Sequence, residues 1–558
     1  MNNDTRRTIL GAVLFASLFM IWNQWLEYSG KTPMFSFGKK PAVTASAPAS
    51  AQDAAASLPA SSSSAPAQST SASPALAAAP AVAGEKISVS TDVLKLTFNT
   101  TGASLVGAEL LHFHEQSNME MTAFKLLDSS TSLQYMVQTG LIGGDYPNHL
   151  TPMKLVTPER ELAAGKNELQ VRFESDPVGG VKLVKTYTLK RGSYAITVEN
   201  DATNTGTAPV TAQLYNQLVR DNSKTPGSST FYSTYTGPAF YSDEEKYQKT
   251  PFSDIEKGKA TYQKSTNNGY VAMVQQFFAT AWLPEAGKPR ENYVRQQDGL
   301  YAAGQIFNLG SIAPGATSTN KTTLFVGPQQ EQVMRQLSPN LEAVKDYGRL
   351  TIIARPLYWL LTQLNSILHN WGWSIMALVV LLKIAFYWFN HKAYSSMAKM
   401  RTLSPKLEEL KKRYPDDKEK LQVETMRMYR EEKINPLGGC LPMLIQMPVF
   451  FALYSALSST VEMRGAPWIW WIKDLAAPDP YYILPILMTA SSLLQVWLNP
   501  KPSDPTQAKL MWLMPLSFAF MFFFFPSGLV LYWLTNNLLS IAQQWLINKQ
   551  IDSKTAKA

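Results

Sequence analysis

Lys383 is the residue whose type and position most clearly indicate chemistry, because this cation lies within a long apolar run. The run extends from Trp371 to Phe389. A lysine at the centre of a bilayer costs ~2.5–3.5 kcal/mol, so such residues are usually functional. Tyr387 and Asn390 follow at spacings of four and seven, which places them on the same helix face as Lys383. The alternative is that the aliphatic stem lets the amine reach the nearby interface.

Polar residues form similar stripes in other apolar runs. Tyr532, Asn536 and Ser540 recur every four residues, and Ser491 and Gln495 are also four apart. Because polar groups within a membrane must face protein or water, these stripes predict a wet, positively charged groove. For any single residue, an ordinary hydrogen bond between helices is the alternative. The predicted groove residues are Lys383, Tyr387, Gln446, Gln495, Tyr532, Asn536 and Ser540.

The composition excludes most metal and redox chemistry. The 558 residues include one cysteine and five histidines, which rules out an intramolecular disulfide and a multi-cysteine metal site. His112 and His114 alternate on one predicted strand, a weak metal candidate. There is no His-Glu-x-x-His motif and no carboxylate within the apolar runs. We therefore expect no enzymatic activity, no metal and no cofactor. The net charge of +9 is weak evidence for nucleic acid, and we expect no nucleic-acid substrate.

The N-terminal region predicts a membrane anchor followed by a linker. Arg6 and Arg7 precede a nineteen-residue apolar run, longer than the core of a cleavable signal peptide. The basic residues place the N-terminus in the cytoplasm. We assign residues 1–28 to the anchor. Residues 29–84 are rich in Ala, Ser and Pro, which is typical of a flexible linker.

Residues 85–330 show the alternation of β-strands. Leu94, Leu96 and Phe98 alternate with polar residues, and a turn at Lys190–Ser193 predicts a hairpin. This pattern predicts a large antiparallel β-sandwich. Its position after an anchor with a cytoplasmic N-terminus predicts that it is periplasmic. Residues 331–370 connect it to the remainder of the chain. They include an amphipathic helix from Arg355 that would lie along the outer membrane interface, with Pro356 at its first position. A linker helix packed on the β domain is the alternative.

Five apolar runs follow, and residues 371–548 are predicted to form a five-helix membrane core. The segment 391–436 between the first two runs is rich in Lys and Arg, which places it in the cytoplasm. With the anchor, this predicts a polytopic α-helical membrane protein with six transmembrane helices and both termini cytoplasmic. The runs are Trp371–Phe389, Leu437–Thr460, Tyr482–Leu498, Leu510–Phe525 and Leu529–Ile547.

The segment 391–436 is predicted to form a helical hairpin. Its turn lies at Tyr414–Asp417, where Asp416 or Asp417 caps the second helix. Methionine is common on surfaces that bind varied partners, although a plain packing seam is an equal alternative. Residues 549–558 form a short basic tail. The residues predicted to contact clients or partners are Met397, Met400, Lys411, Lys412 and Arg413.

Several short motifs resemble the YidC family of membrane protein insertases in Gram-negative bacteria. They are Ser396–Arg401, Asn435–Cys440, Leu444–Pro448, Asp479–Ile486 and Phe525–Tyr532. The resemblance covers essentially the whole chain. It implies a supersandwich-like β domain similar to sugar-mutarotase folds, without that activity. It also implies nascent membrane proteins, the Sec translocon, the ribosome, targeting factors and membrane lipid as partners. At Lys383 the family usually has arginine, which differs in its bidentate hydrogen bonding.

The resemblance implies an insertase and chaperone without covalent chemistry, acting alone or with the Sec translocon. A nascent protein arrives at the hairpin, its polar part enters the groove, and Lys383 attracts its acidic residues. Two rival interpretations remain at this stage. A secondary transporter would need intramembrane carboxylates or inverted repeats. A glycan-binding envelope protein would use aromatic residues such as Phe231, Tyr232, Tyr235, Phe240 and Tyr241 of the β domain.

Overall fold

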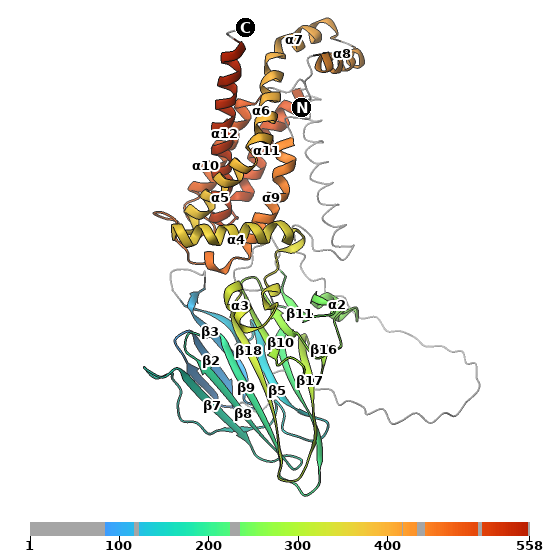
Figure 1. Cartoon of the computed structure of the whole chain (residues 1–558), viewed down its shortest axis with the longest axis vertical. Helices are drawn as coiled ribbons and strands as arrows, with labels where there is room; N and C mark the ends of the chain where they lie inside the picture. Colours follow the sequence, from blue (N-terminus) through green and yellow to red (C-terminus); the bar gives the residue numbers. More distant parts are fainter. Residues whose placement is uncertain are drawn as a thin grey trace, which may run out of the picture.

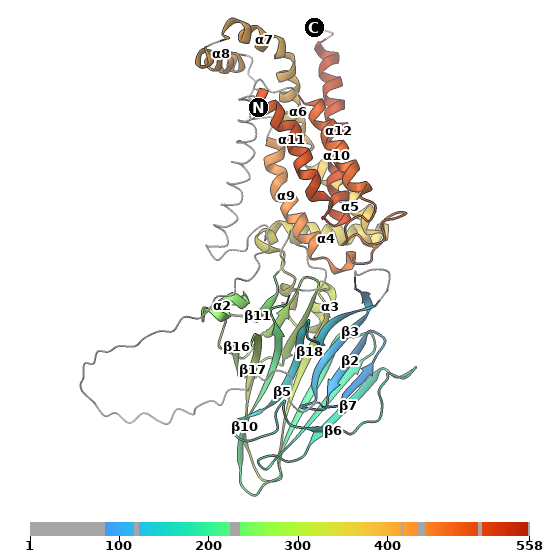
Figure 2. The same ribbon diagram turned by 180° about the vertical axis from the view of Figure 1, so that it is seen from behind.

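The protein consists of a β-rich region followed by a helical bundle (Figures 1 and 2). The predicted anchor and nearly all of the predicted linker lie outside the residues that the structure describes, as do Phe231 and Tyr232. The computed structural model describes residues 84–115, 122–223, 235–415, 417–431, 441–499 and 505–555.

Two nine-stranded antiparallel sheets build the β-rich region. The first sheet has the strand order β1 (Lys86–Ser90), β2 (Leu94–Asn99), β3 (Ser104–His114), β4 (Ala123–Ser129), β5 (Gln134–Ile142), β10 (Val210–Asp221), β17 (Leu300–Ile312), β16 (Arg290–Gln297) and β13 (Ser265–Thr266). The second has the order β12 (Lys246–Lys249), β11 (Gly237–Ser242), β14 (Tyr270–Val274), β15 (Phe278–Pro284), β18 (Thr317–Pro328), β9 (Ala195–Asn204), β8 (Val181–Lys190), β7 (Glu168–Ser175) and β6 (Met153–Leu155). A short helix, α2 (Phe252–Glu256), follows β12.

The alternation in the sequence matches the burial of the strands. In β2 the side chains of Leu94, Leu96 and Phe98 are fully buried, while the residues between them are half-buried. Phe98 packs with Phe173 of β7 across the core, with ring centroids 5.5 Å apart. The turn between β8 and β9 uses Gly192 at φ +69°, a conformation that glycine adopts without strain. The predicted antiparallel β domain is therefore confirmed.

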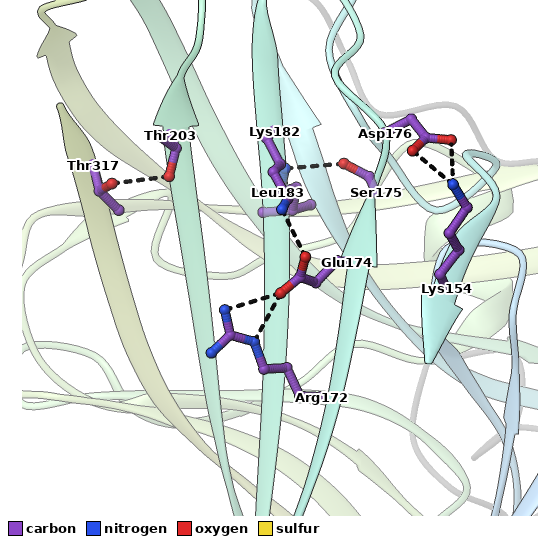
Figure 3. A network of polar contacts seen from close by, with 9 residues as sticks. All are labelled: Lys154, Arg172, Glu174, Ser175, Asp176, Lys182, Leu183, Thr203 and Thr317. Carbon is purple, nitrogen blue, oxygen red and sulfur yellow. Dashed lines mark hydrogen bonds and ion pairs between the residues drawn. The ribbon is translucent and has the colours of Figure 1, made fainter. Parts of the chain in front are cut away.

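Polar pairs connect neighbouring strands on the outward face of the second sheet (Figure 3). Glu174 of β7 accepts hydrogen bonds from Lys182 of β8, at 2.6 Å, and from Arg172, at 3.1 Å. The bond from Lys182 is the main reason that the pKa of the Glu174 carboxyl lies below its ordinary value. Thr203 and Thr317 pair their hydroxyls at 2.8 Å between β9 and β18. Such exposed contacts keep strands in register and each contribute little stability.

Helices make up most of the chain after β18. They are α3 (Glu331–Leu337), the 3-10 turns η1 (Leu341–Val344) and η2 (Gly348–Leu350), α4 (Thr351–Leu368), α5 (Trp371–Ala385), α6 (Tyr387–Thr402), α7 (Ser404–Arg413), α8 (Lys418–Glu431), α9 (Leu441–Ser458), α10 (Ile483–Leu498), α11 (Pro505–Phe522) and α12 (Ser527–Thr555). In both views α4 lies across the base of the bundle, between the bundle and the β-rich region (Figures 1 and 2).

The amphipathic helix begins earlier than expected. α4 starts at Thr351, so the prediction that Pro356 occupies the first helical position is wrong, and this proline lies inside the helix. Ala354, Leu357 and Leu361 are buried against the bundle, which compensates for the backbone hydrogen bond that proline cannot donate. At the other end of the chain, α12 continues through most of the predicted tail to Thr555.

The apolar run Trp371–Phe389 is not one helix. α5 ends at Ala385, Phe386 leaves the helical conformation, and α6 starts at Tyr387 after a bend of 67°. Neither proline nor glycine marks this break. Within the described residues no single helix has the length and hydropathy that a membrane span requires, whereas α5 and the part of α6 up to Ser396 meet that requirement as a bent pair.

The segment after α9 joins the bundle to the β-rich region. Glu462 accepts a hydrogen bond from the Tyr358 hydroxyl of α4 at 3.0 Å, and its carboxylate lies 3.7 Å from the buried amine of Lys345. Two residues later, Arg464 donates to the carbonyl of His114 at 2.7 Å and lies over the ring of Phe124. Contacts from one short segment therefore hold both parts of the molecule together.

Candidate functional site

A pocket opens between four helices of the bundle, α5, α6, α9 and α12. It encloses about 440 Å³ of empty space, part of which is open to the surroundings. Polar groups gather on one part of its wall and apolar side chains on the rest. The lining residues are Val379, Leu382, Lys383, Phe386, Phe389, Asn390, Gln446, Val449, Tyr532 and Asn536.

Lys383 brings a cation to this pocket. Its Nζ donates a hydrogen bond to Ser540 Oγ of α12 at 2.6 Å, and the Ser540 hydroxyl in turn donates to the Asn536 carbonyl at 2.7 Å. The amine therefore points sideways into the bundle, toward α12, in this structure. None of the residues lining the pocket is a carboxylate, so no anion there neutralises the charge.

Two more hydrogen bonds connect α12 to the other walls of the pocket. Gln446 Nε2 of α9 donates to Asn536 Oδ1 at 2.5 Å. Asn390 Nδ2 of α6 donates to Gln543 Oε1 at 3.5 Å, which is a weak bond by its length. The polar stripe of α12 therefore faces three different helices.

Not every predicted groove residue reaches the pocket. Four of them line the pocket: Lys383, Gln446, Tyr532 and Asn536. Ser540 does not line it but accepts the hydrogen bond from Lys383. Tyr387 does not line it, because the bend after Ala385 turns this ring outward, where 51% of the residue is exposed.

Gln495 also lies elsewhere. It belongs to α10, which packs against a different face of α12. That face carries its own polar contacts. Asn537 Nδ2 donates to Ser492 Oγ at 2.9 Å and lies 3.4 Å from Ser491 Oγ, and Gln544 Nε2 donates to Asn499 Oδ1 at 3.1 Å.

The sequence pattern places Asn390 on the same helix face as Lys383, although Asn390 is not among the predicted groove residues. The aromatic side chains that line the pocket are not among them either. Phe386, which lies at the helix break, and Phe389, in the first turn of α6, both line the pocket. The available signal was the cluster of four aromatic residues at 386–389, which ends the apolar run.

The charged hairpin consists of the end of α6, α7 and α8. Asp417 accepts a hydrogen bond from the backbone N–H of Lys420 at 3.0 Å, so it caps α8 as expected. Lys411, Lys412 and Arg413 form the last turn of α7, where positive charge also interacts favourably with the helix dipole. Met397 and Met400 belong to α6, but their side chains lie outside the described part of the structure.

The part of the chain that the structure describes contains no metal site of His, Cys, Asp or Glu side chains. Among the described residues no three His, Cys, Asp or Glu side chains gather closely enough to hold an ion. His112 and His114 both lie on β3 and point away from the core.

The fold and the pocket together define a class of protein: a helical bundle whose pocket is lined by a lysine, joined to an antiparallel β domain. Family models agree with this division. The model described as the YidC periplasmic domain matches residues 86–360, and the model described as the 60Kd inner membrane protein matches residues 363–554.

Curated relatives match over almost the full length. The chain is 50% identical to the membrane protein insertase YidC of Bordetella petrii, covering 100% of this chain and 99% of the relative. It is 51% identical to that of Bordetella avium, covering 99% and 100%. For Cupriavidus pinatubonensis the identity is 49%, with 99% of each chain covered. The chain therefore belongs to the YidC family of membrane protein insertases, which are inner membrane proteins and not enzymes.

Solved structures show a more distant similarity. A crystal structure of an active YidC insertase with its first transmembrane domain resolved matches 83% of this chain and 94% of its own, at 19% identity and a TM-score of 0.39. A galactose mutarotase related enzyme from Lactobacillus acidophilus matches 43% of this chain and 97% of its own, at 7% identity and a TM-score of 0.30.

Proposed function

We propose that the pocket around Lys383 is the groove through which this insertase receives the polar part of a nascent membrane protein. The observation that carries the proposal is an amine beside open space, with no carboxylate among the lining residues. Such a cation attracts acidic residues of a client, and the attraction is stronger in a site with little water. Ser540 holds the amine in place until the client arrives.

The apolar part of the client moves along the outside of the bundle into lipid. This step is supported by large apolar side chains on the bundle surface, such as Met447 of α9 and Leu516 and Phe520 of α11, which are 42%, 52% and 66% exposed. These side chains and lipid tails are similarly apolar. An apolar client helix can therefore move from the bundle surface into lipid with little change in free energy. Bent or short spans would also thin the bilayer locally and lower the barrier for the polar part.

Six membrane spans are proposed, with both termini in the cytoplasm. The β domain is then periplasmic and α4 lies at the outer interface, where its exposed side chains Ile352, Trp359 and Ile367 would contact lipid. Cysteine reporters at Ser404 and Ser193, in a Cys440→Ser background, should label from opposite sides of the membrane. Labelling of both from one side would contradict this topology.

The proposed domain map keeps the sequence-based boundaries. It assigns an anchor to 1–28, a linker to 29–84, the β domain to 85–330, a connecting segment to 331–370, the core to 371–548 and the tail to 549–558. By family resemblance we propose that the β domain has the supersandwich arrangement without sugar-mutarotase activity.

The cytoplasmic hairpin is the proposed contact for clients and partners. Its basic residues Lys411, Lys412 and Arg413 and its methionines Met397 and Met400 are the candidates. The Sec translocon, the ribosome and targeting factors are proposed as partners by family resemblance, together with membrane lipid.

Reconstitution tests the proposed function. The purified chain in liposomes should insert a single-span client with a short acidic N-terminal part, so that this part becomes protected from external protease. Liposomes that contain the chain with Lys383→Glu serve as the matched control. Equal protection in both preparations would contradict a role for the groove.

A further inference from the structure

We propose that α10 and α12 move as one unit during insertion, and that the groove opens along the contact of α12 with α5, α6 and α9. This inference rests on the proposed function of the groove. Two sets of polar contacts on α12 carry it. We call the first set the groove seam, formed by the bonds Lys383–Ser540, Asn390–Gln543 and Gln446–Asn536. The second set is the α10 seam, formed by the bonds of Asn537 with Ser491 and Ser492 and by Gln544–Asn499.

The two seams differ in what surrounds them. The pocket lies along the groove seam, where Asn536 and Gln543 are half-buried while their neighbours Ser540 and Asn390 are buried. On the α10 seam, Asn537 and Gln544 are buried, at 6% and 2% exposure. Separating α10 from α12 would leave these amides in an apolar environment without their partners, which is costly. Separating the groove seam instead exposes its polar groups to the groove, where water or a client replaces each lost bond.

The size of the pocket requires such a separation. Part of its 440 Å³ of empty space is open to the surroundings, so the enclosed part is smaller and admits at most a few side chains. An inserting polypeptide therefore needs the walls to move apart. A few side-chain hydrogen bonds hold the three groove-side helices to α12: those of the groove seam, and those of Tyr394 with Ser540 and of Gln446 with Tyr532. The break between α5 and α6 at Phe386 provides a place where that wall can bend.

Asn537 is then a positioning residue. It binds α10 and not the client, and it keeps the polar stripe of α12 turned toward Lys383. Its neighbour Asn536, one residue earlier on the helix, faces Gln446 on the other side. The same turn of α12 therefore belongs to both seams.

Reversible cross-linking tests the inference, using the full chain in vesicles with Cys440→Ser. The pair Phe450→Cys and Trp533→Cys joins α9 to α12 on the groove side, where the two rings lie 4.4 Å apart and neither residue lines the pocket. The pair Asn499→Cys and Gln544→Cys joins the end of α10 to α12 without touching Asn537, and it is the matched control. A short reducible thiol cross-linker connects each pair, and each variant is compared with its own reduced state. Asn390→Cys with Gln543→Cys is a second groove-side pair, which serves if the first is poorly produced.

We expect the groove-side cross-link to lower client insertion by about 10-fold or more, as for other steps gated by a conformational change, and reduction to restore it. The cross-link between α10 and α12 should change insertion by less than about twofold. The inference is overturned if the groove-side cross-link has no effect, or if the α10 cross-link blocks insertion as strongly. Failure of the proposed function looks different, because the reduced proteins would then also insert no client.

Discussion

Two lysines of this molecule, Lys185 in the β domain and Lys383 in the bundle, are both withdrawn from solvent, yet their surroundings differ. Lys185 is fully buried and donates to the backbone carbonyls of Gly102 and Thr139 at 2.6 and 2.7 Å. Lys383 is only partly buried, donates to a side-chain hydroxyl and borders a pocket. Burial alone therefore does not mark a functional cation. The role proposed for Lys383 rests instead on adjacent open space and on a partner that can be replaced.

The largest expected effect concerns Lys185. We expect Lys185→Ala to lower the free energy of unfolding of the β domain by about 4 kcal/mol, because it leaves two carbonyls unpaired and a cavity beside them. Denaturant unfolding of the full chain in detergent measures this. Lys182→Ala, which removes a surface ion pair on the same strand, should cost less than about 1 kcal/mol. Similar losses in both variants would show that the buried contacts of Lys185 are unimportant.

The next effect concerns charge reversal in the groove. Lys383→Glu should reduce insertion of acidic clients by about 100-fold, because repulsion replaces attraction at a site with little water. Protein levels and unfolding should stay close to those of the wild type. Lys392→Glu on α6 is the matched control, since Lys392 lies over the ring of Trp388 and does not line the pocket. Equal insertion by the two variants would remove the distinction between groove and surface lysines.

The sequence predicts the two regions to different extents, because each region has a different pattern of residue types. Alternation of Leu94, Leu96 and Phe98 was enough to predict the β domain, because one face of each strand must be buried. Lys383 stood out because it is a charge in an apolar run. Lys185 gave no such signal, since Lys182 and Lys190 lie on the same strand and are partly exposed.

The helix break and the final choice of groove residues needed the structure. No proline or glycine accompanies Phe386, so the outward turn of Tyr387 could not be inferred from residue types. Gln495 has the same spacing as groove residues, yet its helix packs on another face of α12. Spacing defines a face of one helix but not the neighbour that the face meets.

A smaller effect concerns pH and the β domain alone. Burial, and next the charge of Lys185, lower the pKa of His149 to about 4, and its Nδ1 pairs with the Tyr215 hydroxyl. The unfolded chain binds this proton near pH 6.5, so stability present above pH 6.5 is lost as the pH falls toward 4, by about 2–3 kcal/mol at pH 4.5. Thermal unfolding between pH 7.5 and 4.5 measures the loss. The slope should be smaller in His149→Gln, and an unchanged slope would assign the effect to other groups.

The smallest effect concerns the hairpin, which lies apart from both lysines. Asp417→Ala removes the cap of α8 and should destabilise its first turn by about 1 kcal/mol. Faster amide exchange in the first turn of α8, with unchanged exchange in β8 and α12, is the expected observation. A uniform increase along the chain would mean that the cap affects more than its own helix.

The central claim, that Lys383 acts on acidic client segments, is tested most directly by protease protection of two matched clients in vesicles. The clients differ only in having acidic or neutral residues in the translocated part, and the levels of insertase are equal. Lys383→Arg should insert both clients. Lys383→Ala should insert the neutral client normally and the acidic client about 10-fold less, because only the latter loses an attraction. Full insertion of both clients by Lys383→Ala would contradict the proposed role of this residue.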